Sequence, residues 1–194
     1  MSALDAAGQD LIFREARTRN GWTDEPITDA QIQEIYDLMK FGPTAANSTP
    51  ARFVWVRSEE AKARLKPHLM EGNYKALKAS AIVIVGRDLD FPEHMPRLFP
   101  HAPGAKDWYA DPVVREGHAF RNSTLQGAYL IVAARALGFD VGPMSGFDNA
   151  GVDKEFFAGA NTKSNFIAAI GHGTDEFLFP RGPRFDFAEI NTIL

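Results

Sequence analysis

The chain has 194 residues, of which 45% are hydrophobic and 24% are charged, and this composition is ordinary for one globular domain with a sizeable core. Its formal net charge of -4 gives no reason to expect nucleic acid or an anionic membrane as a partner. No cysteine is present, which excludes disulfides, cysteine-ligated metals and thiolate catalysis. We therefore predict a single domain over residues 1–194.

The first twenty residues lack the basic-then-apolar order of a signal peptide. The longest apolar runs, AIVIVG and AYLIVAA, have the size of core elements and are too short to span a membrane. We expect a cytoplasmic protein that has no membrane partner.

Apolar residues recur at moderate helical spacing over residues 4–17, and a basic cluster containing Arg17, Thr18 and Arg19 follows. Cations in the last turn of a helix interact favourably with the helix dipole, which is a structural explanation for the cluster. Two arginines that flank a threonine are equally suited to holding a phosphate or a carbonyl-rich ring edge.

A second helix is predicted to start at Thr28, which forms a capping-box pattern with Gln31, and to end near Gly42 as its C-cap glycine. The next stretch, FGPTAANSTPAR at 41–52, places proline, hydroxyl and amide residues between two core elements. Composition alone favours a plain loop, and a ligand-binding turn is the alternative.

Residues 52–57 are predicted to form a buried strand, and residues 81–85 and 164–171 form two further apolar strands. Continuous apolar strands are buried on both faces, so we expect helices on either side of the sheet. A helix interrupted at Pro67 is predicted over 58–70.

Residues 87–112 are rich in prolines and bulky aromatics without a regular pattern, which predicts a mobile or partner-contacting excursion. The longest helix is predicted over 113–138; it is apolar nearly all round and therefore central. Two glycines and a proline follow in FDVGPMSGF, where the backbone is able to come close to another group.

Several common catalytic motifs are absent, among them GxGxxG, GxxxxGK[ST] and GxSxG. The five histidines show no metal-ligand spacing, so no metal site is predicted. Without a thiol or a recognisable triad, covalent catalysis is disfavoured, and a bound organic cofactor is the expected source of any chemistry.

Six segments occur in a characteristic order: RTRNGW, FGPTAANSTPAR, LFPH, FRNSTLQGAYLIVAARALG, GPMSGFD and KSN. Together they resemble the FMN-dependent nitroreductase superfamily, and more closely its RutE/HadB subfamily of malonic semialdehyde reductases associated with pyrimidine breakdown. The matching segments run from Arg17 to Asn165, so the resemblance covers nearly the whole chain.

The resemblance implies an α+β, nitroreductase-like fold, with a central mixed or antiparallel sheet flanked by helices, in an intertwined homodimer whose two FMN sites are shared between subunits. It also implies an oxidoreductase that passes a hydride from NAD(P)H through N5 of FMN to a second substrate in a ping-pong reaction, without a catalytic protein side chain. Malonic semialdehyde, reduced to 3-hydroxypropionate, is the expected substrate. Without a dinucleotide fingerprint, the sequence does not choose between NADH and NADPH.

The implied FMN contacts fall into five segments. The N-terminal motif and two late arginines face the phosphate end, a turn packs on the flavin ring of the other subunit, a lysine stabilises negative charge at N1, and a backbone segment approaches N5. These residues are Arg17, Thr18, Arg19, Pro43, Thr44, Ala45, Asn47, Lys75, Pro143, Met144, Ser145, Gly146, Arg181 and Arg184. Considered singly, the lysine and the late arginines are equally explained as solvated surface charges.

A 3-oxo acid needs a proton donor for the developing alkoxide and a cation for its carboxylate. As a hypothesis separate from the resemblance, we predict that these come from Arg97, His101, Arg115 and Arg121. Two other functions stay open: a general nitroaromatic or quinone reductase on the same fold, and a non-catalytic flavin-binding or interaction module.

Overall fold

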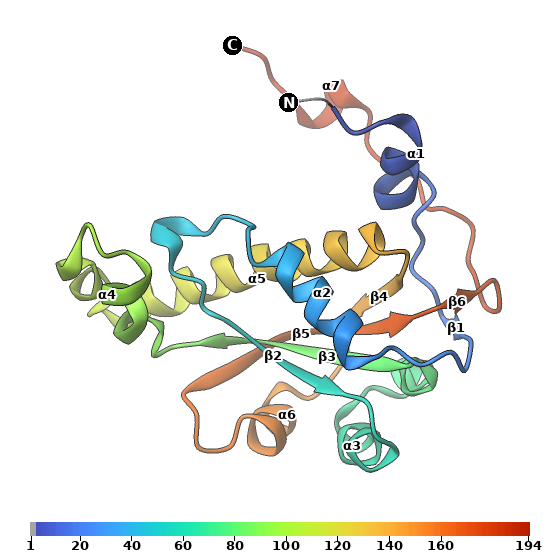
Figure 1. Cartoon of the computed structure of the whole chain (residues 1–194), viewed down its shortest axis with the longest axis horizontal. Helices are drawn as coiled ribbons and strands as arrows, with labels where there is room; N and C mark the ends of the chain where they lie inside the picture. The colour runs from blue at the N-terminus through green and yellow to red at the C-terminus, as the bar shows by residue number, and fades with distance from the viewer. Residues whose placement is uncertain (1–2) are drawn as a thin grey trace.

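The computed structural model describes residues 3–194, and its centre is a four-stranded antiparallel sheet with the spatial order β2-β3-β5-β4 (Figure 1). The strands are β2 (Ala51–Val56), β3 (Ala81–Asp88), β4 (Asp140–Met144) and β5 (Thr162–Gly171). Two short strands, β1 (Gly21–Trp22) and β6 (Gly173–Thr174), form a second sheet. The predicted α+β fold is confirmed, and the main sheet is antiparallel throughout.

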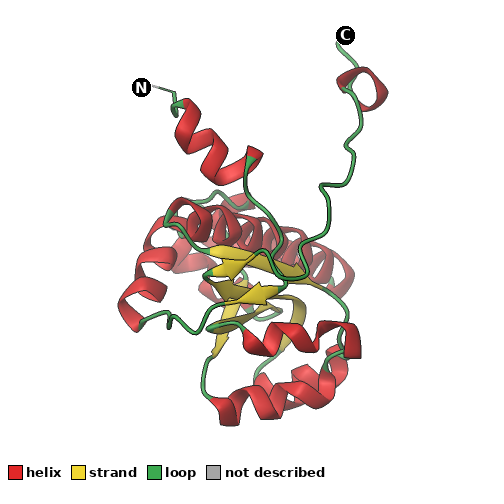
Figure 2. Cartoon of the chain, turned by 90° about the vertical axis from the view of Figure 1, so that its right-hand side faces the viewer, coloured by secondary structure: helices red, strands yellow, loops and turns green. Residues whose placement is uncertain are grey.

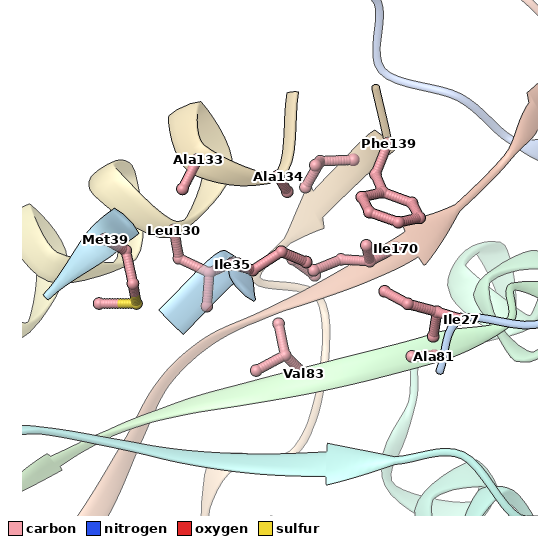
Figure 3. Close-up of a cluster of buried hydrophobic side chains, with 12 residues drawn as sticks. Ile27, Ile35, Met39, Ala81, Val83, Leu130, Ala133, Ala134, Phe139 and Ile170 are labelled. Atoms are coloured by element: carbon pink, nitrogen blue, oxygen red, sulfur yellow. The ribbon is translucent and has the colours of Figure 1, made fainter. Parts of the chain in front are cut away.

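Helices cover both faces of the main sheet, as predicted (Figure 1). On one face lie α2 (Asp29–Met39) and α5 (Pro112–Ala136), and on the other α3 (Glu59–Leu65), η4 (Glu71–Lys78) and α6 (Asn149–Phe156). Figure 3 shows how Ile35 of α2, Leu130 of α5 and Val83 of β3 meet in the first of these layers. Burying one such side chain fully stabilises a fold by about 1.5–3 kcal/mol, so this layer fixes α5 firmly over the sheet.

The ends of α2 and α5 follow from local hydrogen bonds. The Gln31 N–H donates to Thr28 Oγ1 at 3.2 Å and the Thr28 N–H donates to Gln31 Oε1 at 2.8 Å, which confirms the capping box. Asp111 caps α5 by accepting from the Val113 N–H at 2.7 Å. The helix stops before Gly138, whose φ of 84° is a conformation that glycine adopts at little cost.

Gly42 does not have the predicted role of a C-cap glycine. α2 ends at Met39, and Gly42 is not among the glycines with positive φ. A Cβ added to Gly42 would lie 2.3 Å from a ring atom of Tyr129, so the glycine is needed for close packing on α5.

One prediction about a strand is also wrong, and one strand was missed. Residues 52–55 of β2 are only partly buried, because β2 is an edge strand with β3 on one side only. β4 was not predicted, because Gly142 and Pro143 are typical of turns. β4 is the opposite edge of the sheet, where a proline has no outer neighbour that needs its missing N–H.

The segment 87–112 carries regular structure, in contrast to the prediction. It forms η5 (Phe91–His94), α4 (Met95–Leu98) and η6 (Pro103–Tyr109). Their buried side chains pack with Ala119 of α5 in a cluster of their own: Phe91, Met95, Ala105 and Tyr109. The prolines begin or kink short helices here, which is why no long periodic pattern is visible in the sequence.

Both ends of the chain project from the body of the molecule (Figure 2). The N-terminal part forms α1 (Ala6–Gln9) and a π-helical turn, Asp10–Arg14, and the C-terminal part ends with α7 (Phe187–Ile190). Large apolar side chains of the C-terminal part are exposed: Phe177, Phe179, Phe185, Phe187, Ile190, Ile193 and Leu194. Over residues 3–194, no helix combines the length and apolar character that crossing a membrane requires.

Candidate functional site

Three adjoining cavities lie where the N-terminal segment, η4 and the end of β4 meet. The basic cavity, of about 290 Å³, is lined by the four arginines Arg17, Arg135, Arg181 and Arg184. The lysine cavity, of about 180 Å³, contains Lys75, and the apolar cavity, of about 340 Å³, lies between α5 and β4. Thr18 and Asn20 line the first two cavities, and Pro143 and Met144 line the last two, so the cavities form one row.

The arginines of the basic cavity bond to backbone carbonyl groups. Arg181 Nη2 donates to the carbonyl of Arg14 at 2.6 Å and to that of Ala16 at 3.1 Å, and Arg17 donates to the carbonyl of Phe179. Arg184 Nη1 donates to carbonyls within its own turn. No carboxylate among residues 3–194 forms an ion pair with these side chains, so the cavity is a concentrated positive site of the kind that binds a phosphate.

Arg135 was not predicted as a site residue. Its Nη1 donates to the carbonyl of Ile12 at 3.3 Å, and its Nε is buried without a hydrogen-bond partner in the described part of the chain. Burial lowers the pKa of Arg135; the charge of Asp140 raises it, and the nearby Arg181 lowers it again. In the sequence Arg135 is only a cation in the last turn of a helix, which has an ordinary explanation in the helix dipole.

Arg19 is placed differently from Arg17. Its Nε lies 3.3 Å from Asp140 Oδ1, and its Nη1 forms an ion pair with Asp175. Burial lowers the pKa of Arg19, but its interactions with Asp175 and Asp140 outweigh this effect and raise the pKa. Arg19 lines the lysine cavity while its charge is balanced by these two carboxylates, so it fastens the N-terminal segment to β4 and β6.

Lys75 is the cation of the lysine cavity. Its Nζ lies 5.9 Å from the centre of the Phe179 ring, and no carboxylate within residues 3–194 pairs with it. A Cβ at Gly142 would stand 3.0 Å from the carbonyl oxygen of Arg19, so the missing side chain allows the two backbones to lie close. The result is a narrow space with one unbalanced positive charge.

Ser145, the first residue after β4, borders the apolar cavity, and Gly146 follows it. The carbonyl of Gly146 accepts from Asn73 Nδ2 at 2.8 Å and from the Met70 N–H at 3.1 Å, which fixes the segment in place. Within residues 3–194, the backbone N–H groups of Ser145 and Gly146 donate no hydrogen bond. They are donors left available at the end of a rigid strand.

The turn 43–50 lies apart from the three cavities. Pro43, Thr44, Ala45 and Asn47 line none of them. The Asn47 side chain donates to the carbonyl of Leu98 at 2.8 Å, so its amide nitrogen is already bonded within the chain. Within one protomer, the structure therefore brings together the N-terminal, η4, β4 and C-terminal candidates, and leaves the turn elsewhere.

The four candidate substrate residues also lie outside the cavities. Arg97 lines a separate cavity of about 580 Å³ beside β2, and the exposed His101 packs on Phe99 with ring centres 3.9 Å apart. Arg115 is partly buried near the start of α5, and Arg121, further along the same helix, is exposed. No three His, Asp or Glu side chains gather in a potential metal site within the described range.

The amino-acid sequence also matches a known protein family. The model described as the nitroreductase family matches residues 14–172, and the chain belongs to that family. A relative from Caulobacter sp. (strain K31), described as a "putative NADH dehydrogenase/NAD(P)H nitroreductase", is 65% identical over the full length of both chains. A relative from Burkholderia lata with the same description is 57% identical, again over both full lengths.

Solved structures share the fold. A nitroreductase-type structure from Bacillus subtilis has a TM-score of 0.89 at 22% identity and covers 98% of this chain and all of its own. A structure from Exiguobacterium sibiricum, described as a complex with FMN, has a TM-score of 0.87 at 20% identity, with coverage of 100% of this chain and 99% of its own. The fold assignment is therefore independent of the sequence resemblance.

The row of cavities fits FMN. Four arginines without carboxylate partners suit a phosphate, Lys75 suits a ring edge that becomes negative on reduction, and the donors at 145–146 suit a ring nitrogen. The buried Nε of Arg135 lacks a protein partner, as a donor at a ligand site does. The lining of the cavities includes Thr18, Lys75 and Ser145, and none of them needs to act as a nucleophile, because bound FMN would itself supply the redox chemistry.

Proposed function

We propose that this nitroreductase-family protein is an FMN-dependent oxidoreductase that uses NAD(P)H to reduce a small oxo acid. The particular reaction proposed is reduction of malonic semialdehyde to 3-hydroxypropionate in pyrimidine degradation. The observation that carries the cofactor assignment is the row of cavities, with four unbalanced arginines at one end, Lys75 in the middle and free backbone donors at the other end. The substrate rests on the resemblance of the sequence segments to malonic semialdehyde reductases.

The chain's own residues bind and orient the cofactor. Arg17, Arg135, Arg181 and Arg184 hold the phosphate, and Thr18 adds a hydroxyl group where the basic and lysine cavities meet. Arg19 keeps this end of the site rigid through its carboxylate partners. Bound FMN supplies hydride transfer at its N5 between NAD(P)H and the second substrate.

Lys75 and the segment 143–146 act on the ring. The ammonium group of Lys75 favours the negative charge that a reduced flavin carries at N1, and a low-dielectric cavity strengthens this effect. The backbone N–H groups of Ser145 and Gly146 would be available to donate to a ring nitrogen, and Pro143 and Met144 would offer the ring a lining without polar side chains. Binding and exclusion of water are thus the main contributions of this segment.

The proposal includes an intertwined homodimer with a shared site. The turn 43–47 lies away from the cavities of its own protomer, so it is free to cover the flavin bound to the other subunit. The exposed apolar residues of the segment 177–194 and the unpaired edge of β2 are surfaces that a second copy buries. We expect wild-type protein to be dimeric by light scattering and a chain truncated after Glu176 to be monomeric. A dimeric truncated chain refutes the role of the tail in the dimer whether or not it retains FMN, because the truncation also removes Arg181 and Arg184.

The same fold supports a second candidate, a nitroaromatic or quinone reductase. The descriptions of the relatives at 57–65% identity favour it. Reduction of an oxo acid needs a cation and a proton donor that the apolar cavity of one protomer lacks. Under the first proposal, Arg97, His101, Arg115 or Arg121 of the other subunit supplies them.

One preparation tests these proposals. Purified protein is incubated with FMN, desalted and examined for yellow colour, and NADH or NADPH oxidation is then measured with malonic semialdehyde, a nitroaromatic compound and a quinone. Retained FMN and fastest turnover with malonic semialdehyde support the first proposal. Retained FMN with preference for planar aromatic acceptors supports the second, FMN retained without turnover supports a non-catalytic module, and a protein that retains no FMN refutes the cofactor assignment.

A further inference from the structure

Helix α5 presents three polar side chains to the turn 43–51. His118, Asn122 and Gln126 are spaced by four residues, so they lie on one face of the helix, one above the other. Asn122 is 1% exposed and Gln126 is 7% exposed, which is unusual for amides unless they are hydrogen-bonded. We call these three residues the α5 ladder.

Each member of the α5 ladder holds one point of the turn. Asn122 Oδ1 accepts from the Ala45 N–H at 2.8 Å, and Gln126 Oε1 accepts from the Ala51 N–H at 2.8 Å. His118 Nε2 lies 2.9 Å from the hydroxyl of Ser48, which is fully buried. The two ends and the middle of the turn are therefore tied to α5, a helix that packs into the core over the main sheet.

The turn needs such support because of its backbone. Ala46, Asn47 and Thr49 all have positive φ, at 52°, 47° and 38°, and none of them is glycine. Residues in this region persist only where the surroundings over-determine the conformation, and such strain gathers at binding sites. Pro43, Ala45 and Asn47 are exposed, so part of the strained turn is available as an outer surface.

The segment 88–111 supports the same turn from a second direction. The ring of His118 stacks on Phe91, with centres 5.1 Å apart and planes inclined by 18°, and packs against Tyr109 at 4.4 Å. The Asn47 side chain donates to the carbonyl of Leu98. His118 thus links the turn, α5 and the cluster of short helices in one block.

We propose that His118, Asn122 and Gln126 are positioning residues that hold the turn 43–51 in the shape that covers FMN in the neighbouring subunit. This inference rests on the proposed FMN site and extends it to residues that touch no cofactor. Their effect is exerted through the turn, so loss of a ladder bond weakens FMN binding and changes the surroundings of the ring while leaving the fold intact.

The pair His118 and Ser48 allows a direct test, because both partners are side chains. His118→Leu, Ser48→Ala and the double variant are prepared without cofactor, and FMN affinity is measured from quenching of its fluorescence. Each single variant is expected to weaken binding about 2- to 10-fold, the range for losing one buried hydrogen bond. The double variant is expected to bind no more weakly than His118→Leu, because the two changes remove the same bond. If the losses of FMN affinity in the two single variants add up in the double variant, His118 does not act through its bond to Ser48 and the proposal is refuted.

His118→Gln and Ser123→Ala are the matched controls. Glutamine retains a group that is able to bond to the Ser48 hydroxyl, so His118→Gln should recover affinity relative to His118→Leu. Ser123 is fully buried on the same helix, where it donates to the carbonyl of Phe120 and accepts from Asn165, away from the turn. Ser123→Ala should lower the melting temperature without changing FMN affinity; an equal loss of affinity assigns the ladder a general stabilising role and overturns the proposal.

Hydrogen exchange supplies a readout that does not need the cofactor. In cofactor-free protein, amides of residues 43–51 should exchange faster in His118→Leu than in wild type, with unchanged exchange in β3. The visible spectrum of bound FMN should shift in His118→Leu and not in Ser123→Ala. A wild-type protein that binds no FMN refutes the proposed function, whereas wild-type binding with unaltered turn exchange and affinity in His118→Leu refutes the ladder alone.

Discussion

Replacing Arg135 with leucine separates cofactor binding from folding more sharply than any other change at the site. The guanidinium group lies in the basic cavity with three other arginines, so its removal takes away one charge-assisted hydrogen bond to the phosphate. Such a bond contributes about 1.5–3 kcal/mol, so we expect FMN to bind roughly 10- to 150-fold more weakly. The loss should be concentrated in the dissociation rate.

The stability of the cofactor-free protein should change in the opposite direction or not at all. Without FMN, Arg135 leaves a buried Nε unbonded, and burial and the charge of Arg181 both disfavour its charged form. A leucine carries no buried donor or charge, so it removes this cost, and its shorter apolar side chain fills part of the space. We therefore expect a melting temperature at or above that of wild type for cofactor-free Arg135→Leu.

Two measurements on one preparation test this prediction: an FMN fluorescence titration and thermal unfolding without FMN. Arg64→Leu is the matched control, because Arg64 pairs with Glu155 on the surface at 2.5 Å and lines none of the three cavities. Arg64→Leu should leave FMN affinity unchanged. Unchanged affinity in Arg135→Leu, or a large loss of stability with affinity retained, contradicts the assignment of Arg135 to the phosphate.

Three further predictions follow from single contacts. Lys75→Met should lower the midpoint potential of bound FMN, because the reduced flavin loses a nearby positive charge that stabilises it. Potentiometric titration measures the change, and about 30 mV corresponds to 1.4 kcal/mol in a two-electron couple. An unchanged potential contradicts the placement of Lys75. Gly42→Ala should destabilise the fold by about 1–3 kcal/mol, because the new Cβ meets the Tyr129 ring, and a melting temperature equal to that of wild type contradicts this. Burial, and to a smaller extent the charge of Arg121, lowers the pKa of His118 from its ordinary value of 6.5. The unfolded chain therefore binds the proton more readily than the folded chain. The stability that the neutral His118 contributes above pH 6.5 is lost as the pH falls. Urea unfolding between pH 5 and 8 should show a smaller acid-side loss in His118→Gln than in wild type, and equal losses contradict the reasoning.

Local signals were enough to predict several boundaries of the fold. Thr28 with Gln31 and the stop at Gly138 depend on contacts within one helical turn, so the sequence contains all the necessary information. The exposure of β2 and the strand β4 depend on which strands lie at the edges, and this is decided by pairing across the whole chain. The hydrophobic pattern of a single segment therefore does not predict whether its strand lies at the edge of the sheet.

The candidate site was predictable in part for a similar reason. Family-like segments pointed to Arg17, Lys75 and Met144, and the structure gathers these residues in one row of cavities. The use of the Arg19 charge was not predictable, because its partners Asp140 and Asp175 are 121 and 156 positions away. Arg135 escaped prediction because a basic residue at a helix end is common for purely structural reasons.

The separation of the turn 43–47 from the cavities of its own protomer has a genetic consequence in the proposed dimer. One allele that damages the turn and another that damages the arginines are each inactive alone, because every site needs a turn from one chain and a phosphate pocket from the other. When the two chains are made together, mixed dimers contain one site built from two intact halves, so roughly a quarter of all sites should work if the chains associate at random. Such intragenic complementation is able to reveal the shared architecture in living cells.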